Sequence, residues 1–116
     1  MGYITGYAGF FQPALSVVIA NGAQLSAVIN CGGMALCGIK LPATFTGTSL
    51  TFEICDTAGG TFQPLYNSVN ELVSMDVTQG RWYAIDPAFF QGVQFLKIKS
   101  GSAEGGARTL VCQLKG

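Results

Sequence analysis

The chain carries little charge and no histidine. Charged side chains make up 10% of its 116 residues, against about 25% in an average soluble domain. Without histidine, the commonest general base and the usual catalytic triads are missing, and so is a frequent zinc ligand. We therefore expect no enzyme activity, no intrinsic metal and no cofactor. A surface with so few charges is expected to be partly covered by other protein.

The few charges are balanced, and long apolar runs are also missing. Six basic and six acidic residues give a net charge of zero, which disfavours direct binding to nucleic acid through phosphate contacts. The longest nearly apolar stretch, PALSVVIA at residues 13–20, is far short of the ~20 residues that a membrane-spanning helix needs. We expect neither nucleic acid nor membrane as a partner.

The N-terminus and the cysteines together indicate a reducing compartment. Residues 1–12 (MGYITGYAGFFQ) lack the basic start and unbroken apolar core of a secretory signal. This predicts action in, or release from, the cytoplasm that makes the protein, where thiols stay reduced. Zinc would need more closely paired cysteines than the C-x5-C spacing found here. The cysteines predicted to be buried or half-buried thiols are Cys31, Cys37, Cys55 and Cys112.

Alternation of apolar and polar residues predicts β-structure almost throughout. Roughly eight short strands follow one another at about 8–12-residue spacing, and no segment predicts a helix of three turns. The turn dipeptides Asn21-Gly22 and Gln79-Gly80 separate some of them. We predict an all-β fold, an eight-stranded antiparallel jelly-roll sandwich; an immunoglobulin-like sandwich is second because no Cys…Trp…Cys spacing supports it. The predicted core contains Leu15, Val17, Ile19, Phe52, Ile54, Val73, Met75, Ile98, Leu110 and Leu114.

The first residues differ in kind from the rest. Aromatic side chains follow glycine repeatedly before any strand pattern begins. Glycine is costly to order, while aromatic rings supply large contact areas. We divide the chain into an extended N-terminal arm, residues 1–12, and a single jelly-roll domain, residues 13–116. The arm is expected to contact a partner through Tyr3, Ile4, Tyr7, Phe10 and Phe11.

A turn between two predicted strands carries two adjacent phenylalanines. In DPAFFQG, residues 86–92, Asp86-Pro87 opens the turn and Gly92 closes it, with room for at most one helical turn. One ring is enough to anchor so short a loop, and a second on a charge-poor surface lowers solubility unless it is covered. We predict that one of Phe89 and Phe90 fills the end of the sandwich and that the other faces a neighbouring protein.

The acidic residues offer no convincing catalytic pair. Glu53 and Asp56 lie around a predicted hairpin and are expected to point to opposite faces. Asp76 and Asp86 are separated by a turn and could approach each other. In a β-rich domain such residues more often form turns or face solvent, so we assign no catalytic residue.

Three aromatic residues suggest a sugar-binding platform. Trp82 and Tyr83 are adjacent on a predicted strand, and Tyr66 follows another. Because adjacent strand residues face opposite ways, only one of Trp82 and Tyr83 can belong to a given surface. A platform would therefore combine Tyr66 with one of the two.

Three long segments, in their order along the chain, resemble one protein family. They are GIKLPATFTGTSLTFEICDTAGGTFQPLYN (residues 38–67), GRWYAIDPAFFQGVQFLKIKSG (80–101) and ARTLVCQLKG (107–116). Over about residues 15–115 the chain is similar to small jelly-roll proteins encoded in the structural modules of tailed bacteriophages. The likeness lies in the order of the motifs, since no single one is diagnostic. The four cysteines and the aromatic arm depart from the pattern.

The resemblance implies a structural virion protein. The expected role is that of a capsid decoration (cement) protein, which binds the outside of the head and bridges major capsid subunits to stabilise the shell. Its partners would be the major capsid protein and further copies of itself, as a dimer or trimer. It would be assembled in the host cytoplasm and lie on the capsid exterior. The alternative is a carbohydrate-binding jelly-roll module of a phage tail or fibre.

Overall fold

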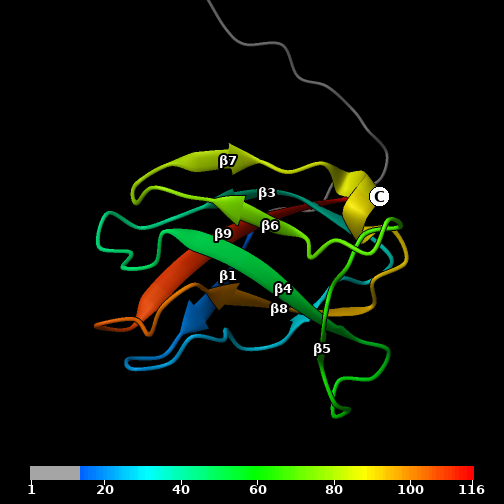
Figure 1. Ribbon diagram of the computed structural model, residues 1–116, viewed down its shortest axis with the longest axis horizontal. Helices are drawn as coiled ribbons and strands as arrows, with labels where there is room; N and C mark the ends of the chain where they lie inside the picture. The colour runs from blue at the N-terminus through cyan, green and yellow to red at the C-terminus, as the bar shows by residue number, and fades with distance from the viewer. Residues whose placement is uncertain (1–13) are drawn as a thin grey trace, which may run out of the picture.

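The computed structural model describes residues 14–116. These residues form nine strands and one short 3-10 helix (Figure 1). The elements are β1 (Leu15–Ile19), β2 (Ile29–Asn30), β3 (Ala35–Lys40), β4 (Ser49–Cys55), β5 (Gln63–Pro64), β6 (Ser74–Asp76), β7 (Trp82–Ala84), η1 (Pro87–Phe90), β8 (Phe95–Ser100) and β9 (Arg108–Lys115). The predicted arm lies outside the described residues, and so do Tyr3, Ile4, Tyr7, Phe10 and Phe11.

The strands form two antiparallel sheets. One sheet has the order β1-β9-β3-β7, and the other has the order β2-β8-β4-β5, with β6 also pairing β4. Strand β8 occupies one side of β4, so β5 and β6 share its other side, each along half of the strand. The predicted all-β, antiparallel class is confirmed.

The described chain has nine strands where eight were predicted. Strand β5 lies in FQPLY (residues 62–66), the segment that follows the predicted DTAGG hairpin loop, and it is only two residues long. It contains Pro64, which cannot donate a hydrogen bond to a sheet and is restricted to edges. We therefore find β5 as a short edge strand.

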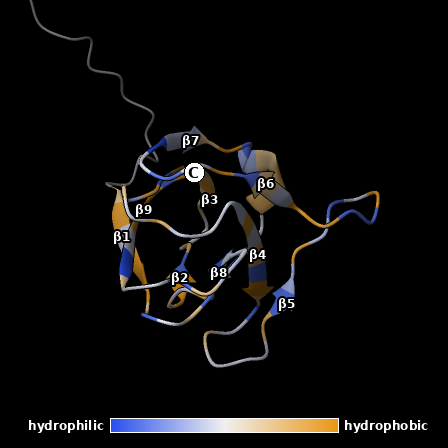
Figure 2. Ribbon diagram, turned by 60° about the vertical axis from the view of Figure 1, so that its left-hand side comes forward, coloured by the Kyte–Doolittle hydropathy of each residue, from blue (hydrophilic) through white to orange (hydrophobic). Residues whose placement is uncertain are grey.

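The core lies between the two sheets (Figure 2). Of the predicted core residues, Val17, Ile19, Phe52, Ile98, Leu110 and Leu114 are buried, whereas Leu15, Ile54, Val73 and Met75 are partly buried and pack against the core. The second group lies at strand ends or on the β6 edge, where the opposite sheet covers less of the side chain.

A buried carboxylate closes one end of the sandwich, where β8 ends and β9 begins. Glu104, 1% exposed, accepts backbone N–H hydrogen bonds from Thr46 at 2.8 Å and Gly47 at 3.0 Å. It also accepts the Ser100 hydroxyl at 2.7 Å and the Arg108 Nε at 3.0 Å. These contacts tie the loop between β8 and β9 to the loop before β4. We call this the Glu104 end.

An aromatic ring closes the opposite end. Phe90 is fully buried, and its ring packs edge-on against Phe52, with centroids 4.9 Å apart and planes at 79°. The Asp86 carboxylate accepts the Ala88 N–H at 3.0 Å and caps η1. Gly92, with φ of 81°, leads the chain out of the turn. The predicted single helical turn is confirmed, and we call this the η1 end.

Candidate functional site

Large exposed apolar side chains occur in η1 and in the β5–β6 loop beside it. Tyr66, Val69 and Leu72 are 52%, 69% and 42% exposed, and Phe89 is 44% exposed. The first three belong to the loop between β5 and β6, which projects away from the two sheets in Figure 2. We call these four residues the Phe89 surface. Exposed patches of this kind mark interaction sites more often than scattered single residues do.

Internal hydrogen bonds hold the projecting loop in shape. Tyr66 and Leu72 form an isolated antiparallel bridge, which places them opposite each other. The Asn67 carboxamide oxygen accepts the N–H groups of Val69 at 3.0 Å and Glu71 at 2.9 Å. A loop that is already ordered presents its side chains to a partner at a lower entropic cost.

Phe89 lies between three surface hollows. One, of about 140 Å³, is floored by Phe52 and bordered by Val73 beside β6. The second, of about 280 Å³, extends to Leu65. The third, of about 350 Å³, is shared with Tyr66. A partner can therefore place side chains on three sides of the exposed ring.

The charged residues around Phe89 are acidic. Asp86 lines the first hollow and Asp56 the second, while Glu71 lies in the projecting loop next to Leu72. No lysine or arginine lines any of the three hollows. The surface suits an apolar anchor with basic side chains beside it.

Phe89 and Phe90 have separate roles in the structure. Phe90 is entirely buried, so it anchors the turn and is not available to a partner, which corrects its assignment as an interface residue. Phe89 is the exposed ring, and its contact with a neighbour stays a prediction. Consecutive residues of one tight turn thus point to opposite sides.

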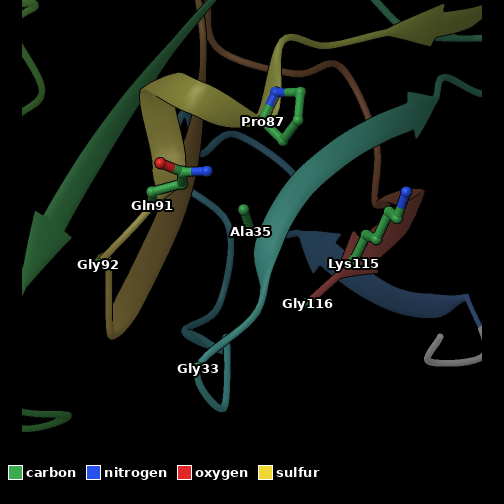
Figure 3. A pocket seen from close by; sticks show the side chains of 7 residues that line it. All are labelled: Gly33, Ala35, Pro87, Gln91, Gly92, Lys115 and Gly116. Carbon is green, nitrogen blue, oxygen red and sulfur yellow. The ribbon is translucent and has the colours of Figure 1, made fainter. Parts of the chain in front are cut away.

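A further hollow, of about 380 Å³, lies between η1 and the end of β9 (Figure 3). Among its lining residues, only Gln91 and Lys115 have polar side chains. Leu15, the first residue of β1, pairs with Cys112, three positions before Lys115. The described chain therefore begins at the η1 end, near this hollow.

The acidic residues form no paired site. Glu53 lies 3.9 Å from Lys99, measured from carboxylate oxygen to Nζ. Asp86 caps η1, whereas Asp76 ends β6 on the side away from the hollow next to Phe89. Within residues 14–116 no group of three or more potential metal-ligating side chains comes together.

The cysteines are buried or half-buried thiols, as the sequence predicts. Cys31 and Cys112 are buried, and Cys37 and Cys55 are half-buried. Burial raises the pKa of Cys112 to about 12, and the nearby Cys31 adds to the rise. Burial likewise raises the pKa of Cys31. The two buried thiols are therefore protonated and unreactive at neutral pH.

The three candidate sugar-binding aromatics do not share a surface. Trp82 is 57% exposed, whereas Tyr83 packs against the core and its hydroxyl accepts the Thr78 N–H at 2.6 Å. Adjacent residues of β7 thus face opposite ways, as predicted. Tyr66 and Phe89 line the same hollow at the η1 end. Trp82 is the first residue of β7 and therefore lies at the end of that strand that is remote from η1.

The companions of Phe89 were not identified from the sequence as one surface. The sequence pattern indicates Tyr66 only as a sugar-binding candidate and gives no role to Val69 and Leu72. The signal that could have found them is local: large apolar side chains in a turn that contains Asn67 and Asn70. Strand alternation does not explain such residues, so they point to a covered loop.

Comparisons with known proteins gave no match. No family model, curated protein or solved structure matches the chain. Within residues 14–116 there is no helix long and apolar enough to cross a membrane.

Proposed function

We propose that this is a structural virion protein, a capsid decoration (cement) protein that binds the outside of the head and bridges major capsid subunits. The order of the three sequence segments supports the phage family. The single structural observation that supports a docking role is the Phe89 surface, an apolar patch on an ordered loop with acidic neighbours. Exposed aromatic anchors are typical of protein interfaces.

The proposed fold is a jelly roll, and the strand pairing supports it. The antiparallel pairs are β1 with β9, β2 with β8, β3 with β7, and β4 with β6. This nested pattern is the one expected when a single long hairpin is rolled into two sheets, as in a jelly roll. Strand β5 is an addition beside β6 on the β4 edge.

The arm supplies the proposed bridge between capsid subunits. Residues 1–12 can span at most about 43 Å when fully extended, which is comparable to the longest dimension of the domain, 43 Å. The arm is therefore long enough to reach a subunit that the domain does not touch. An aromatic anchor contributes about 2 kcal/mol or more at such a contact, and repetition over many shell sites adds avidity.

The test is binding of the purified chain to bare capsids. If it is a decoration protein, the full chain should bind in hundreds of copies per head. Heads that lack it should be intact but fragile. Deletion of residues 2–11 should leave a folded domain with at least tenfold weaker binding, because about 1.4 kcal/mol corresponds to tenfold. A copy number of only a few per particle, or unchanged binding by the folded deletion variant, would overturn the proposal.

The second candidate is a carbohydrate-binding module of a tail or fibre. The observation that favours it is Trp82, an exposed indole ring on an edge strand. Under this alternative, Trp82→Ala should abolish binding to a glycan array and adsorption to host cells. A decoration protein should keep its capsid binding in a variant that has lost the indole ring.

A further inference from the structure

A second exposed aromatic lies among basic residues. Trp82 and Lys40 are directly opposite each other on β7 and β3, so their side chains share one face of the sheet. Arg81 precedes Trp82, and its carbonyl accepts the Leu41 N–H at 2.9 Å. All three of Lys40, Arg81 and Trp82 are exposed. We call them the Trp82 corner.

The charges of this corner are not neutralised within the described domain. The ion pairs recorded among residues 14–116 are Lys99 with Glu53 and Arg108 with Glu104. Neither involves a residue of the Trp82 corner. The corner therefore presents an indole ring that is 57% exposed, with Lys40 opposite it on the neighbouring strand and Arg81 next to it along the chain.

The Phe89 surface is the complement of this corner. Its acidic neighbours Asp56, Glu71 and Asp86 are likewise absent from the recorded ion pairs. The hollow between Tyr66 and Phe89 measures about 350 Å³, within the range of about 300–1,000 Å³ for pockets that hold small ligands.

We propose that copies of this chain associate head to tail, with Trp82 of one copy inserted beside Phe89 of the next. Lys40 and Arg81 of the first copy then face Asp56, Glu71 and Asp86 of the second. This inference goes beyond the proposed decoration role. It assigns the Phe89 surface to a neighbouring copy, so that capsid binding falls to the arm, and the contact between copies requires no capsid.

The occupant is a second copy because the basic residues of the Trp82 corner complement the acidic residues beside Phe89, and one copy cannot make the contact with itself. Trp82 and Phe89 are seven positions apart, with the paired strand β7 and η1 between them. Figure 1 shows that β7 runs toward η1, so its first residue lies away from the Phe89 surface. Each copy therefore carries one surface at either end of β7.

Such an interface is heterologous. Each copy donates its Trp82 corner to one neighbour and accepts the corner of another, so assembly continues beyond a dimer until a ring closes or a chain extends. Tryptophan and arginine are the residues most enriched at interface hot spots. The charges around the indole ring steer the encounter and make it sensitive to salt.

Two single-sided variants test the proposal by complementation. Trp82→Ala removes the donor and Phe89→Ser removes the acceptor, and sedimentation velocity reports the species present. The wild-type chain should form concentration-dependent species larger than a dimer, and each variant alone should be monomeric. An equal mixture of the two should form heterodimers and nothing larger, because only one matched pair of surfaces remains.

Matched controls separate association from folding. Val18→Ala alters a side chain that is as exposed as Phe89, 44% for each, on strand β1 at the other edge of the sheet. It should associate like the wild type. The double variant Lys40→Glu with Arg81→Glu is a second donor variant that leaves the indole ring in place. Circular dichroism and thermal melts confirm that each variant is folded.

Three outcomes would overturn the proposal. They are a wild-type chain that is monomeric up to about 1 mM, the weak limit of specific contacts; a Trp82→Ala variant that associates like the wild type; and a mixture that does not heterodimerise. Association should also weaken at least tenfold between about 0.05 and 0.5 M salt, as screening of the rim charges requires. A monomeric Trp82→Ala chain that still decorates capsids would leave the decoration role standing.

Discussion

The two ends of the sandwich are closed by different side chains, a charged one at the Glu104 end and an aromatic one at the η1 end. At the Glu104 end, a buried carboxylate binds donors from two loops, and no buried side-chain nitrogen or oxygen in residues 14–116 lacks a partner. At the η1 end, Phe90 fills the gap and Phe89 stands outside it. The first end is complete within the domain. The second end leaves an apolar ring exposed.

The pKa of Glu104 shows that hydrogen bonds within the domain stabilise its charge. Burial raises the pKa of the Glu104 carboxyl, but hydrogen bonds from Thr46, Ser100, Gly47 and Arg108 lower it by more. The net result is a pKa below the ordinary value of 4.5. The anion is thus stabilised by the chain itself and needs no outside partner.

The largest expected effect is the loss of the apolar plug. Phe90→Ala should lower the free energy of unfolding by about 3–5 kcal/mol, because it removes a fully buried ring and leaves a cavity against Phe52. Urea denaturation followed by circular dichroism measures the change. A loss below about 1 kcal/mol, within the range of ordinary surface substitutions, would mean that the η1 end is closed by other contacts.

Removal of the buried carboxylate should cost slightly less. Glu104→Ala leaves the Arg108 guanidinium and the N–H groups of Thr46 and Gly47 without their acceptor. Breaking a buried charged network costs about 3 kcal/mol, which the same denaturation measures. The matched control is Glu71→Gln in the exposed projecting loop, which should change stability by about 0.5 kcal/mol or less. Equal losses for both variants would show that the network adds nothing.

Acid should weaken the Glu104 end selectively. Since the folded-state pKa of Glu104 is lowered, its contribution to stability is fully present above the unfolded-state pKa and is lost as pH falls through the folded-state pKa. The stability difference between the wild type and Glu104→Gln should therefore shrink as the pH falls below 4.5, the ordinary pKa of this carboxyl. Denaturation curves at pH 7, 4.5 and 3 measure it. A difference that stays constant over this range would contradict the assignment.

The same contrast explains what the sequence could predict of the fold. Strand alternation indicates the core faces of β1 and β4, where Val17, Ile19 and Phe52 are buried, since period-2 patterns are local. The role of Glu104 was not predicted, because its partners Thr46 and Gly47 are 58 and 57 residues away along the chain. The loop that carries it contains mostly small residues and shows no pattern of its own.

For the candidate site, too, only features that depend on neighbouring residues could be predicted from the sequence. Two rings in one short turn were enough to predict that one is buried and one exposed, and the opposite orientations of Trp82 and Tyr83 followed from strand geometry. The grouping of Tyr66 with Phe89 was not predictable, because it depends on how the β5–β6 loop packs against η1. The pattern of a single sequence does not indicate long-range packing of this kind.

The smallest expected effect on stability is that of changing Phe89. This change tests most directly whether the η1 end differs from the Glu104 end. Phe89→Ala should change the free energy of unfolding by about 0.5–1 kcal/mol, because the ring is 44% exposed and its loss opens no closed cavity. Val18→Ala, equally exposed, is the matched control. Denaturation measures both, alongside Phe90→Ala.

The outcome distinguishes two views of the η1 end. If Phe89→Ala is nearly neutral for folding yet weakens association at least tenfold, the outer ring contributes to contact with another molecule and not to the domain. If it costs as much as Phe90→Ala, both rings belong to the core, and the η1 end is as self-contained as the Glu104 end. A turn with two phenylalanines would then need no partner, because the domain itself would account for both rings.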